Sequence, residues 1–378
     1  MASPAASPWA AHPLRSVVRV DPKTDPRWEA FVASHPQGSI YHHPAWIEVL
    51  TREYGRPSLC LACLDVDGQV QGILPLIETR GVPLAGGGLA GRRLSSLPRT
   101  PVAGPLVRDD QAAAALLNTA IDWVHHHPGT RLQLRLASPA CDGLVEGLTG
   151  DPWLPSYRLE LPAQATNLRF GDARNHGRIK WALGAAARHG VVVRPAETRD
   201  DLARWYPLYL RTMQAHAAPT RSYRFFKAAW NLLRPRSLMQ LLLAERTEGG
   251  RRELMAGSVF LMFGQTVFYA FNGCSDAGLR LRANDVIQWH AIHDACRAGF
   301  RRYDLGEVVE SQTGLHEFKR KWGAETYRLY RYSYPSSVQA DRAAIDSRAI
   351  AGRLIRTAWR HLPAPAAARL SDWLYGYF

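Results

Sequence analysis

Lysine is scarce in this sequence. Only five of its 47 Lys and Arg residues are lysines, at positions 23, 180, 227, 319 and 321. In a chain so rich in arginine, a position that keeps lysine indicates a need for a compact point charge rather than a planar guanidinium. Two of the five lie in the segment Gly314–Glu325. This segment is therefore the first place to look for chemistry.

Cysteine and long apolar runs are also limited. The five cysteines are an odd number, which argues against a disulfide framework. Cys60 and Cys63 lie in the apolar run 58–64, where strand geometry turns residues three apart to opposite faces, so they cannot hold one metal. We predict packing cysteines and no metal site. His290 and His293 form a helical pair without a third ligand, and we interpret them as packing or surface residues.

No apolar run approaches the roughly 20 residues of a membrane-spanning helix. The first residues show no apolar core of a signal peptide, so we expect a cytoplasmic protein. What the chain has in excess is positive charge, with a formal net charge of +14. This charge favours an anionic partner such as nucleic acid, a phosphorylated sugar, coenzyme A or an acidic membrane surface, without choosing among them.

With 378 residues, the chain is long enough for two domains. Two stretches, 15–164 and 165–335, show the same succession of strand, helices, hairpin, helix and closing strands. We predict an α+β protein of two similar domains with these bounds. The hairpin signal is Asp-Gly at 67–68 between β-rich runs.

The two ends differ from the body. Residues 1–14 are rich in Ala, Pro and Ser, and we expect a disordered lead. Residues 336–378 form a basic amphipathic helical pattern with aromatic residues near the end. Two interpretations stay open for this tail. It either docks on the body as a helix, or lies at the inner face of the membrane as a peripheral contact.

Several short motifs follow one another in a definite order. They include Ser39–Trp46 near the start, the basic stretch Arg178–Val191, and Tyr269-x-x-Asn272. Asp304-Leu-Gly306 then precedes Phe318-Lys319 and Trp322-Gly323. In order and spacing, over about residues 16–335, this set resembles the FemAB/FemX-like branch of the GNAT acyltransferases.

The resemblance implies two tandem domains of the acyl-CoA N-acyltransferase (GNAT) fold with mixed, mostly antiparallel sheets. It implies transfer of an acyl or aminoacyl group to an amine of a cell-envelope glycan, exopolysaccharide or peptidoglycan precursor. The co-substrate would be acyl-CoA or aminoacyl-tRNA, with no bound cofactor, so tRNA is a candidate partner. By the same resemblance, Lys319 stabilises the tetrahedral oxyanion and Phe318 lies beside the reacting carbonyl.

Aminolysis chemistry suggests further site residues. A fixed cation near the developing oxyanion stabilises the transition state by a few kcal/mol. The attacking amine must be neutral, so a nearby carboxylate helps. Asp304 ends a predicted strand, and Gly306 lets the backbone approach closely, which favours Asp304 for orienting the amine; Glu307 and Glu310 are alternatives. Tyr269, Asn272 and Trp46 are candidate donor or acceptor contacts.

One departure from the GNAT pattern concerns phosphate binding. Before the helix predicted at 284–298, the usual glycine-rich pyrophosphate turn is missing. Arg280 and Arg282 are expected to meet phosphates instead, and Asn284 to cap the helix. Coenzyme A in its usual position is therefore disfavoured relative to aminoacyl-tRNA or an altered coenzyme A site.

Two plainer interpretations compete with the catalytic one. Lys319, Arg320 and Lys321 read in isolation as a solvated surface charge run. The whole chain, with its +14 charge and basic tail, is also compatible with a non-catalytic protein that binds nucleic acid or a membrane surface. The cluster Gly86–Gly88 is either a phosphate cradle or a plain loop.

Overall fold

The structure is a computed structural model that describes residues 15–56, 58–80, 91–216, 218 and 220–335. The expected lead at 1–14, the tail at 336–378 and the Gly86–Gly88 loop lie outside these residues. Among the residues described, no helix is both long and apolar enough to cross a membrane. The same part of the chain holds no group of three His, Cys, Asp or Glu side chains that would suit a metal ion.

The first half alternates strands and helices as the sequence pattern predicts. Its elements are β1 (Ser16–Arg19), α1 (Pro26–Ser34), α2 (Pro44–Tyr54), β2 (Ser58–Leu64), β3 (Val70–Arg80), β4 (Arg92–Ser95), β5 (Leu106–Val107), α3 (Asp110–His125), β6 (Thr130–Leu136) and β7 (Gly150–Glu160). The Asp-Gly signal does join an antiparallel pair, β2 and β3. Pro44 stands in the first turn of α2, where a missing N–H costs nothing.

The second half repeats the plan with longer elements. They are α4 (His176–Arg188), β8 (Val191–Pro195), α5 (Arg199–Ala215), α6 (Tyr223–Leu232), β9 (Met239–Glu248), β10 (Arg251–Phe263), β11 (Thr266–Cys274), α7 (Asp276–Arg280), α8 (Ala283–Arg297), β12 (Arg302–Glu307), α9 (Thr313–Arg320) and β13 (Glu325–Tyr334). The segment around Lys319, which the sequence in isolation presents as a surface charge run, lies in the helix α9.

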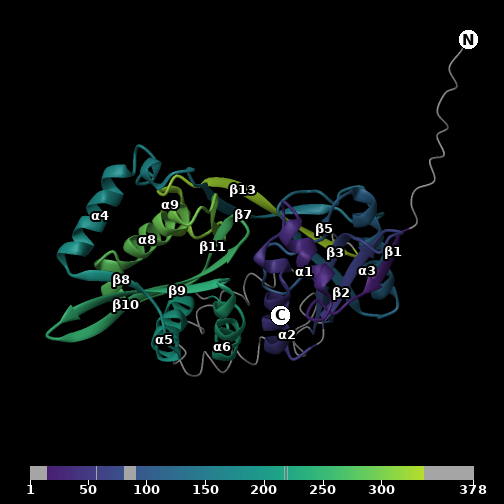
Figure 1. Ribbon diagram of the computed structural model, residues 1–378, viewed down its shortest axis with the longest axis horizontal. Helices are drawn as coiled ribbons and strands as arrows, with labels where there is room; N and C mark the ends of the chain where they lie inside the picture. Colours follow the sequence, from purple (N-terminus) through teal and green to yellow (C-terminus); the bar gives the residue numbers. More distant parts are fainter. Residues whose placement is uncertain (1–14, 57, 81–90, 217, 219, 336–378) are drawn as a thin grey trace, which may run out of the picture.

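One mixed sheet runs through both halves (Figure 1), in the order β1-β2-β3-β4-β6-β13-β7-β12-β11-β10-β9-β8, with β5 pairing on β3. The closing strands of the two halves are exchanged. β7 of the first half pairs with β12 of the second, and β13 of the second pairs with β6 of the first. β7 and β13 also pair with each other. The two halves therefore share the strands at the centre of the sheet.

Alternating side chains divide the core between the two faces of the sheet. On one face, α1, α2, α5 and α6 pack together over both halves. On the other face, α3 covers the first half, and α4 and α8 cover the second. Cys60 and Cys63 belong to cores on opposite faces, and all five cysteines are free, as predicted.

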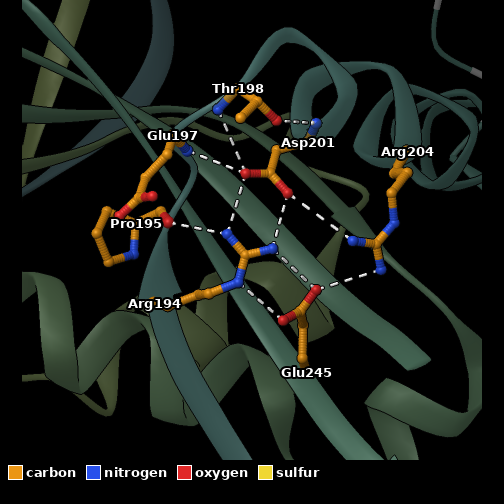
Figure 2. Close-up of polar contacts among 7 residues, drawn as sticks. All are labelled: Arg194, Pro195, Glu197, Thr198, Asp201, Arg204 and Glu245. Atoms are coloured by element: carbon orange, nitrogen blue, oxygen red, sulfur yellow. Dashed lines mark hydrogen bonds and ion pairs between the residues drawn. The ribbon is translucent and has the colours of Figure 1, made fainter. Parts of the chain in front are cut away.

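A charged network ties the outer strands to α5 (Figure 2). The guanidinium of Arg194 donates to Asp201 at 2.7 Å and to Glu245 at 2.8 Å, and Arg204 also pairs with Glu245. Asp201 and Thr198 form a capping box at the start of α5. Its hydrogen bonds to Arg194 hold the pKa of Asp201 well below its usual range. The network stabilises the second half at its outer strands β8 and β9, away from the central strands β7 and β12.

Candidate active site

The centre of the second half contains a fork between two parallel strands. β11 and β12 pair only through three residue pairs, the last of them Phe268 with Asp304. Beyond this point β11 continues against β10, and Ala270 is left without a partner in that register. β12 continues against β7, and Leu305 is likewise extra. A bulge in each strand immediately after the last pair lets the strands part.

The side chain of Lys319 extends from α9 to the end of β12, where the two strands part. Its side chain is buried, with 3% of the residue exposed, and its Nζ donates to the carbonyl oxygens of Gly306 at 2.9 Å and Glu307 at 3.1 Å. A Cβ added to Gly306, which has φ +77°, would stand 3.8 Å from both this Nζ and the Tyr269 carbonyl oxygen. The ammonium is therefore held against the last carbonyls of β12, and the surface charge run is the wrong interpretation for Lys319.

The fork lowers the affinity of Lys319 for its proton. Burial, the largest cause, lowers the pKa of Lys319 to about 8, although the charges of Asp304 and Glu307 oppose the shift. Two of the three N–H groups of the ammonium are bound to carbonyls. The third has no partner among the described residues.

Asp304 lies two residues before Gly306 on β12. Tyr327 donates its hydroxyl to one carboxylate oxygen at 2.8 Å, and the amide of Gly306 donates to the other at 2.7 Å. Burial, the largest cause, raises the pKa of Asp304 above its usual value, and both hydrogen bonds work against that rise. A carboxylate with a raised pKa is a better proton acceptor than an exposed one.

Asp304 and Tyr327 face a cavity of about 320 Å³ between the two halves. Phe268 and Arg302 line it from the second half, and Arg158 lines it from β7. The first half contributes Tyr41, His42 and the loop 101–107. This volume lies at the lower end of the range for small-molecule sites. The cavity is therefore large enough for the reacting part of a substrate.

A second buried carboxylate lies close by. Oε2 of Glu307 is buried and has no hydrogen-bond partner within the described ranges. Burial is again the first cause that raises the pKa of Glu307, with Arg135 and Lys319 opposing it. Glu307 thus remains an alternative to Asp304 as the group that receives a proton. Glu310 instead pairs with Arg328 at the surface.

The start of α8 departs from what the sequence predicted. Arg282, not Asn284, occupies the N-cap, with φ +62°. Asn284 lies inside the first turn, and its Oδ1 is buried without a partner among the described residues. Asp285 in the same turn is 5% exposed and accepts a hydrogen bond from Lys321. A carboxylate here satisfies the positive end of the helix dipole and disfavours a phosphate at the same place.

Other predicted residues are dispersed around the fork. Arg280 is exposed at the end of α7, and the guanidinium of Arg282 lies 5.5 Å from the exposed ring of Trp181. Phe318 is half-buried, and its ring lies 4.4 Å from Nζ of Lys321. Lys319, Gly306 and Asp304 therefore lie close together. Phe318 contacts Lys321 instead, and both arginines are exposed.

Three predicted contact residues occupy structural positions. Tyr269 packs against Phe260 in the core under α8. Asn272 accepts a hydrogen bond from Ser258 on the neighbouring strand. Trp46 is 2% exposed in the core between α2 and α6, and it approaches the cavity only through its contact with Tyr41. None of the three lines the cavity itself.

Sequence reasoning missed Tyr327, Arg158 and Tyr41. Tyr327 lies on β13 and Arg158 on β7, and only the strand exchange brings them beside Asp304. The alternating pattern of 326–334 predicts a strand but not its neighbours. For Tyr41, the motif Ser39–Trp46 includes the correct segment, but the sequence analysis selected Trp46 from it instead of Tyr41.

Comparison with known proteins now defines the class. Residues 172–327 match the family described as "Acetyltransferase (GNAT) domain". The second half of this chain thus resembles a GNAT acetyltransferase domain, which confirms the resemblance noted in the sequence and the prediction of an acyltransferase. No curated protein matches the sequence.

Solved structures extend the likeness to both halves. FemX is 15% identical, covers 84% of this chain and 96% of its own, and superposes with a TM-score of 0.66. L-PGS from Bacillus licheniformis is 12% identical, covers 89% and 98%, and has a TM-score of 0.53. A tandem GNAT protein from the clavulanic acid biosynthesis pathway is 13% identical, covers 85% and 98%, and reaches 0.50. These structures confirm the tandem GNAT-like fold.

Proposed function

We propose that this protein transfers an acyl or aminoacyl group to an amine on a cell-envelope glycan, exopolysaccharide or peptidoglycan precursor. The observation that carries the proposal is the buried ammonium of Lys319, which donates to the carbonyls of Gly306 and Glu307 and interacts with the charge of Asp304. Among the similar folds are FemX and a putative lysylphosphatidylglycerol synthetase, whose name joins an aminoacyl group to a membrane lipid. This supports an acceptor from the envelope.

The chemistry follows from these positions. A neutral amine attacks the carbonyl carbon of the donor, and the developing oxyanion takes the free N–H of Lys319. The amine proton passes to Asp304, which Tyr327 and Gly306 hold in place. The C–N bond forms, the C–S or C–O bond to the donor breaks, and the proton leaves with the departing thiol or hydroxyl. Phe318 packs at the outer side of the fork.

The donor enters from the side of α8. Asp285, which pairs with Lys321, occupies the first turn of that helix, so phosphates meet side chains rather than helix amides. Arg280 and Arg282 are the exposed cations there, and Trp181 offers a ring for stacking. Aminoacyl-tRNA, or acyl-CoA bound in an altered way, suits this surface. We propose that the reaction takes place in the cytoplasm.

The test is product formation with acetyl-CoA, longer acyl-CoAs and charged tRNA, against a panel of amino sugars and envelope precursors, read by mass spectrometry. Lys319→Ala should reduce turnover by about a hundredfold or more, because it removes an oxyanion donor. Arg320→Ala, its exposed neighbour on α9, is the matched control and should retain turnover. If the turnover of Lys319→Ala stays within about twofold of the wild-type value, Lys319 has only a structural role.

A further inference from the structure

Tyr41 brings a hydroxyl group from the first half into the cavity that holds Asp304. The residue is 7% exposed and lines that cavity together with Asp304 and Tyr327. The hydroxyl of Tyr327 is occupied, because it donates to Asp304. The hydroxyl of Tyr41 has no hydrogen-bond partner in the part of the chain that the structure describes. A polar group this deeply placed usually has a partner, and a ligand in the cavity would supply one.

Two aromatic contacts place the ring of Tyr41 beside the strand of Asp304. Its centroid lies 5.2 Å from that of Phe268 and 5.5 Å from that of Trp46. Phe268 is the residue of β11 that pairs with Asp304 of β12. The side chain of the first half therefore reaches the strand pair at which the proposed chemistry takes place.

The segment that carries Tyr41 is held firmly. It forms the short 3-10 helix η1 (Ile40–His42). His42 is 4% exposed, and its Nε2 lies 3.0 Å from the carbonyl oxygen of Gly104. The indole of Trp28 donates to the carbonyl of His42 at 2.8 Å. The hydroxyl of Tyr41 is thus preorganised, which lowers the cost of binding a ligand group there.

Carboxylates surround this hydroxyl. Burial, the largest cause, raises the pKa of Tyr41 well above its usual value, and the charges of Asp304 and Glu307 raise it further. The charge of Arg221, which pairs with Glu53, opposes this rise of the pKa. The hydroxyl therefore stays neutral, and its oxygen faces a region of negative charge. Such a place suits a nitrogen that carries, or is gaining, positive charge.

Asp304 still has room for an amine. Each of its two oxygens accepts one hydrogen bond, from Tyr327 and from the amide of Gly306. A carboxylate oxygen has two lone pairs, so each can accept another N–H. The hydroxyl oxygen of Tyr41 is a second acceptor on the cavity wall.

We propose that the hydroxyl oxygen of Tyr41 accepts one N–H of the acceptor amine while Asp304 accepts another, and that the site therefore selects primary amines. This inference rests on the proposed function, because it concerns the amine of the same reaction. A neutral primary amine has two N–H groups, and its lone pair stays free for the donor carbonyl. A secondary amine has one, which the carboxylate takes as the stronger acceptor. Tyr41 is then left unpaired, and sites built for an N–H reject ligands that lack it.

Amine binding tests this arrangement without acyl transfer. Butylammonium has three N–H groups, and N,N-dimethylbutylammonium has one. Calorimetric titration of the full chain at pH 7 should show saturable binding of butylammonium. Tyr41→Phe should weaken that binding by about tenfold, since a hydrogen bond to a charged group is lost. Binding of the dimethyl compound should change by less than about twofold, so the comparison isolates the contact between hydroxyl and N–H. Equal weakening for both compounds, unchanged binding of butylammonium, or no saturable binding to the wild type would overturn the proposal.

The variant and its control are matched in structure. Tyr41→Phe keeps both ring contacts and breaks no hydrogen bond among the described residues, so the fold is retained. Tyr303 precedes Asp304 on β12, but it is fully buried in the core under α8, with its hydroxyl bonded to Gln288 at 2.7 Å. Tyr303→Phe should leave the binding of both amines unchanged. The same selective weakening in Tyr303→Phe would contradict the role given to Tyr41.

Transfer rates separate this inference from the proposed function. With any donor and primary amine that react, the N-methyl derivative of that amine should have a lower kcat/KM with the wild type. Tyr41→Phe should narrow this difference by about two- to tenfold, because only the primary amine loses a hydrogen bond. An unchanged difference would remove the role of Tyr41 and leave the proposed transfer intact. Selective amine binding without transfer from any donor would instead remove the proposed function and leave an amine-binding site.

Discussion

Tyr327 donates a 2.8 Å hydrogen bond to Asp304, although β7 separates their strands in the sheet. Arg158 of β7 lies opposite Asp304 on one side and Glu325 on the other. A side chain of β13, the last described strand, therefore holds the carboxylate of Asp304 on the earlier strand β12. The strand exchange thus contributes directly to the candidate active site.

We expect Tyr327→Phe to move the acid limb of the rate profile to higher pH. The tyrosine hydrogen bond stabilises the charged carboxylate and lowers the pKa of Asp304. Without it, the carboxylate required as proton acceptor forms only at higher pH. A charged hydrogen bond of about 1.5–3 kcal/mol corresponds to about one to two pH units.

The measurement is kcat/KM between pH 4 and 9. Tyr330→Phe is the control, because Tyr330 lies on the same strand but packs toward the core under α3. An unchanged acid limb in Tyr327→Phe would assign the proton acceptor to Glu307 or to water.

Lys319 should set the alkaline limit of the reaction. Its ammonium form is required for the oxyanion, and its pKa is lowered to about 8 by burial. Activity should therefore fall as pH rises through about 8. Lys319→Arg should remove this fall, because a guanidinium stays protonated, and should lower the maximum rate, because its planar fork does not fit between two carbonyls. A fall at the same pH in Lys319→Arg would mean that another group titrates.

The buried pair of Glu53 and Arg221 should be essential for stability. Both side chains are 2% exposed, and the guanidinium of Arg221 also lies 4.4 Å from the ring of Phe225. Arg221→Gln leaves a buried carboxylate without its cation, at a cost of about 3–5 kcal/mol. Urea unfolding should show this loss.

Arg52→Gln is the control for the buried pair. Arg52 forms an exposed i,i+4 pair with Glu48 on the same helix as Glu53. Its loss should cost about 0.3–0.5 kcal/mol. Comparable losses in Arg221→Gln and Arg52→Gln would show that the buried pair contributes little.

Neither predicted domain should fold well when expressed alone. A fragment of residues 15–164 lacks β13, which covers β6, and lacks β12, which covers β7. Uncovered strand edges promote aggregation. We expect an aggregating fragment by light scattering, and recovery of soluble protein when residues 165–378 are expressed with it. A soluble, cooperatively unfolding fragment would support an independent first domain.

The sequence predicts most elements of this fold, because helices and strands are local patterns. The hairpin at 67–68 and the helix at Pro44 are examples. It does not predict the strand order, since the neighbours of β7 and β13 depend on packing across more than a hundred residues. The predicted bounds 15–164 and 165–335 describe the duplication but not this exchange.

The candidate site was predictable in part for the same reason. Lys319, Gly306 and Asp304 lie within sixteen residues, so their motif is visible in the sequence. Asn284 is not the helix cap, because Arg282, two residues earlier, takes the left-handed N-cap position. Tyr327 and Arg158 carry no local signal of function and are recognised only from their contacts with Asp304 and its strand.

The strand exchange also sets the order in which parts of the fold can form during synthesis. β6 remains an open edge from its emergence until residues 330–334 of β13 have left the ribosome. Throughout that time, the first half is a nascent chain with an unpaired strand, the state that chaperones commonly shield. Asp304 acquires its tyrosine partner only at the same late step. The candidate active site is therefore complete only after nearly the whole described chain has been made.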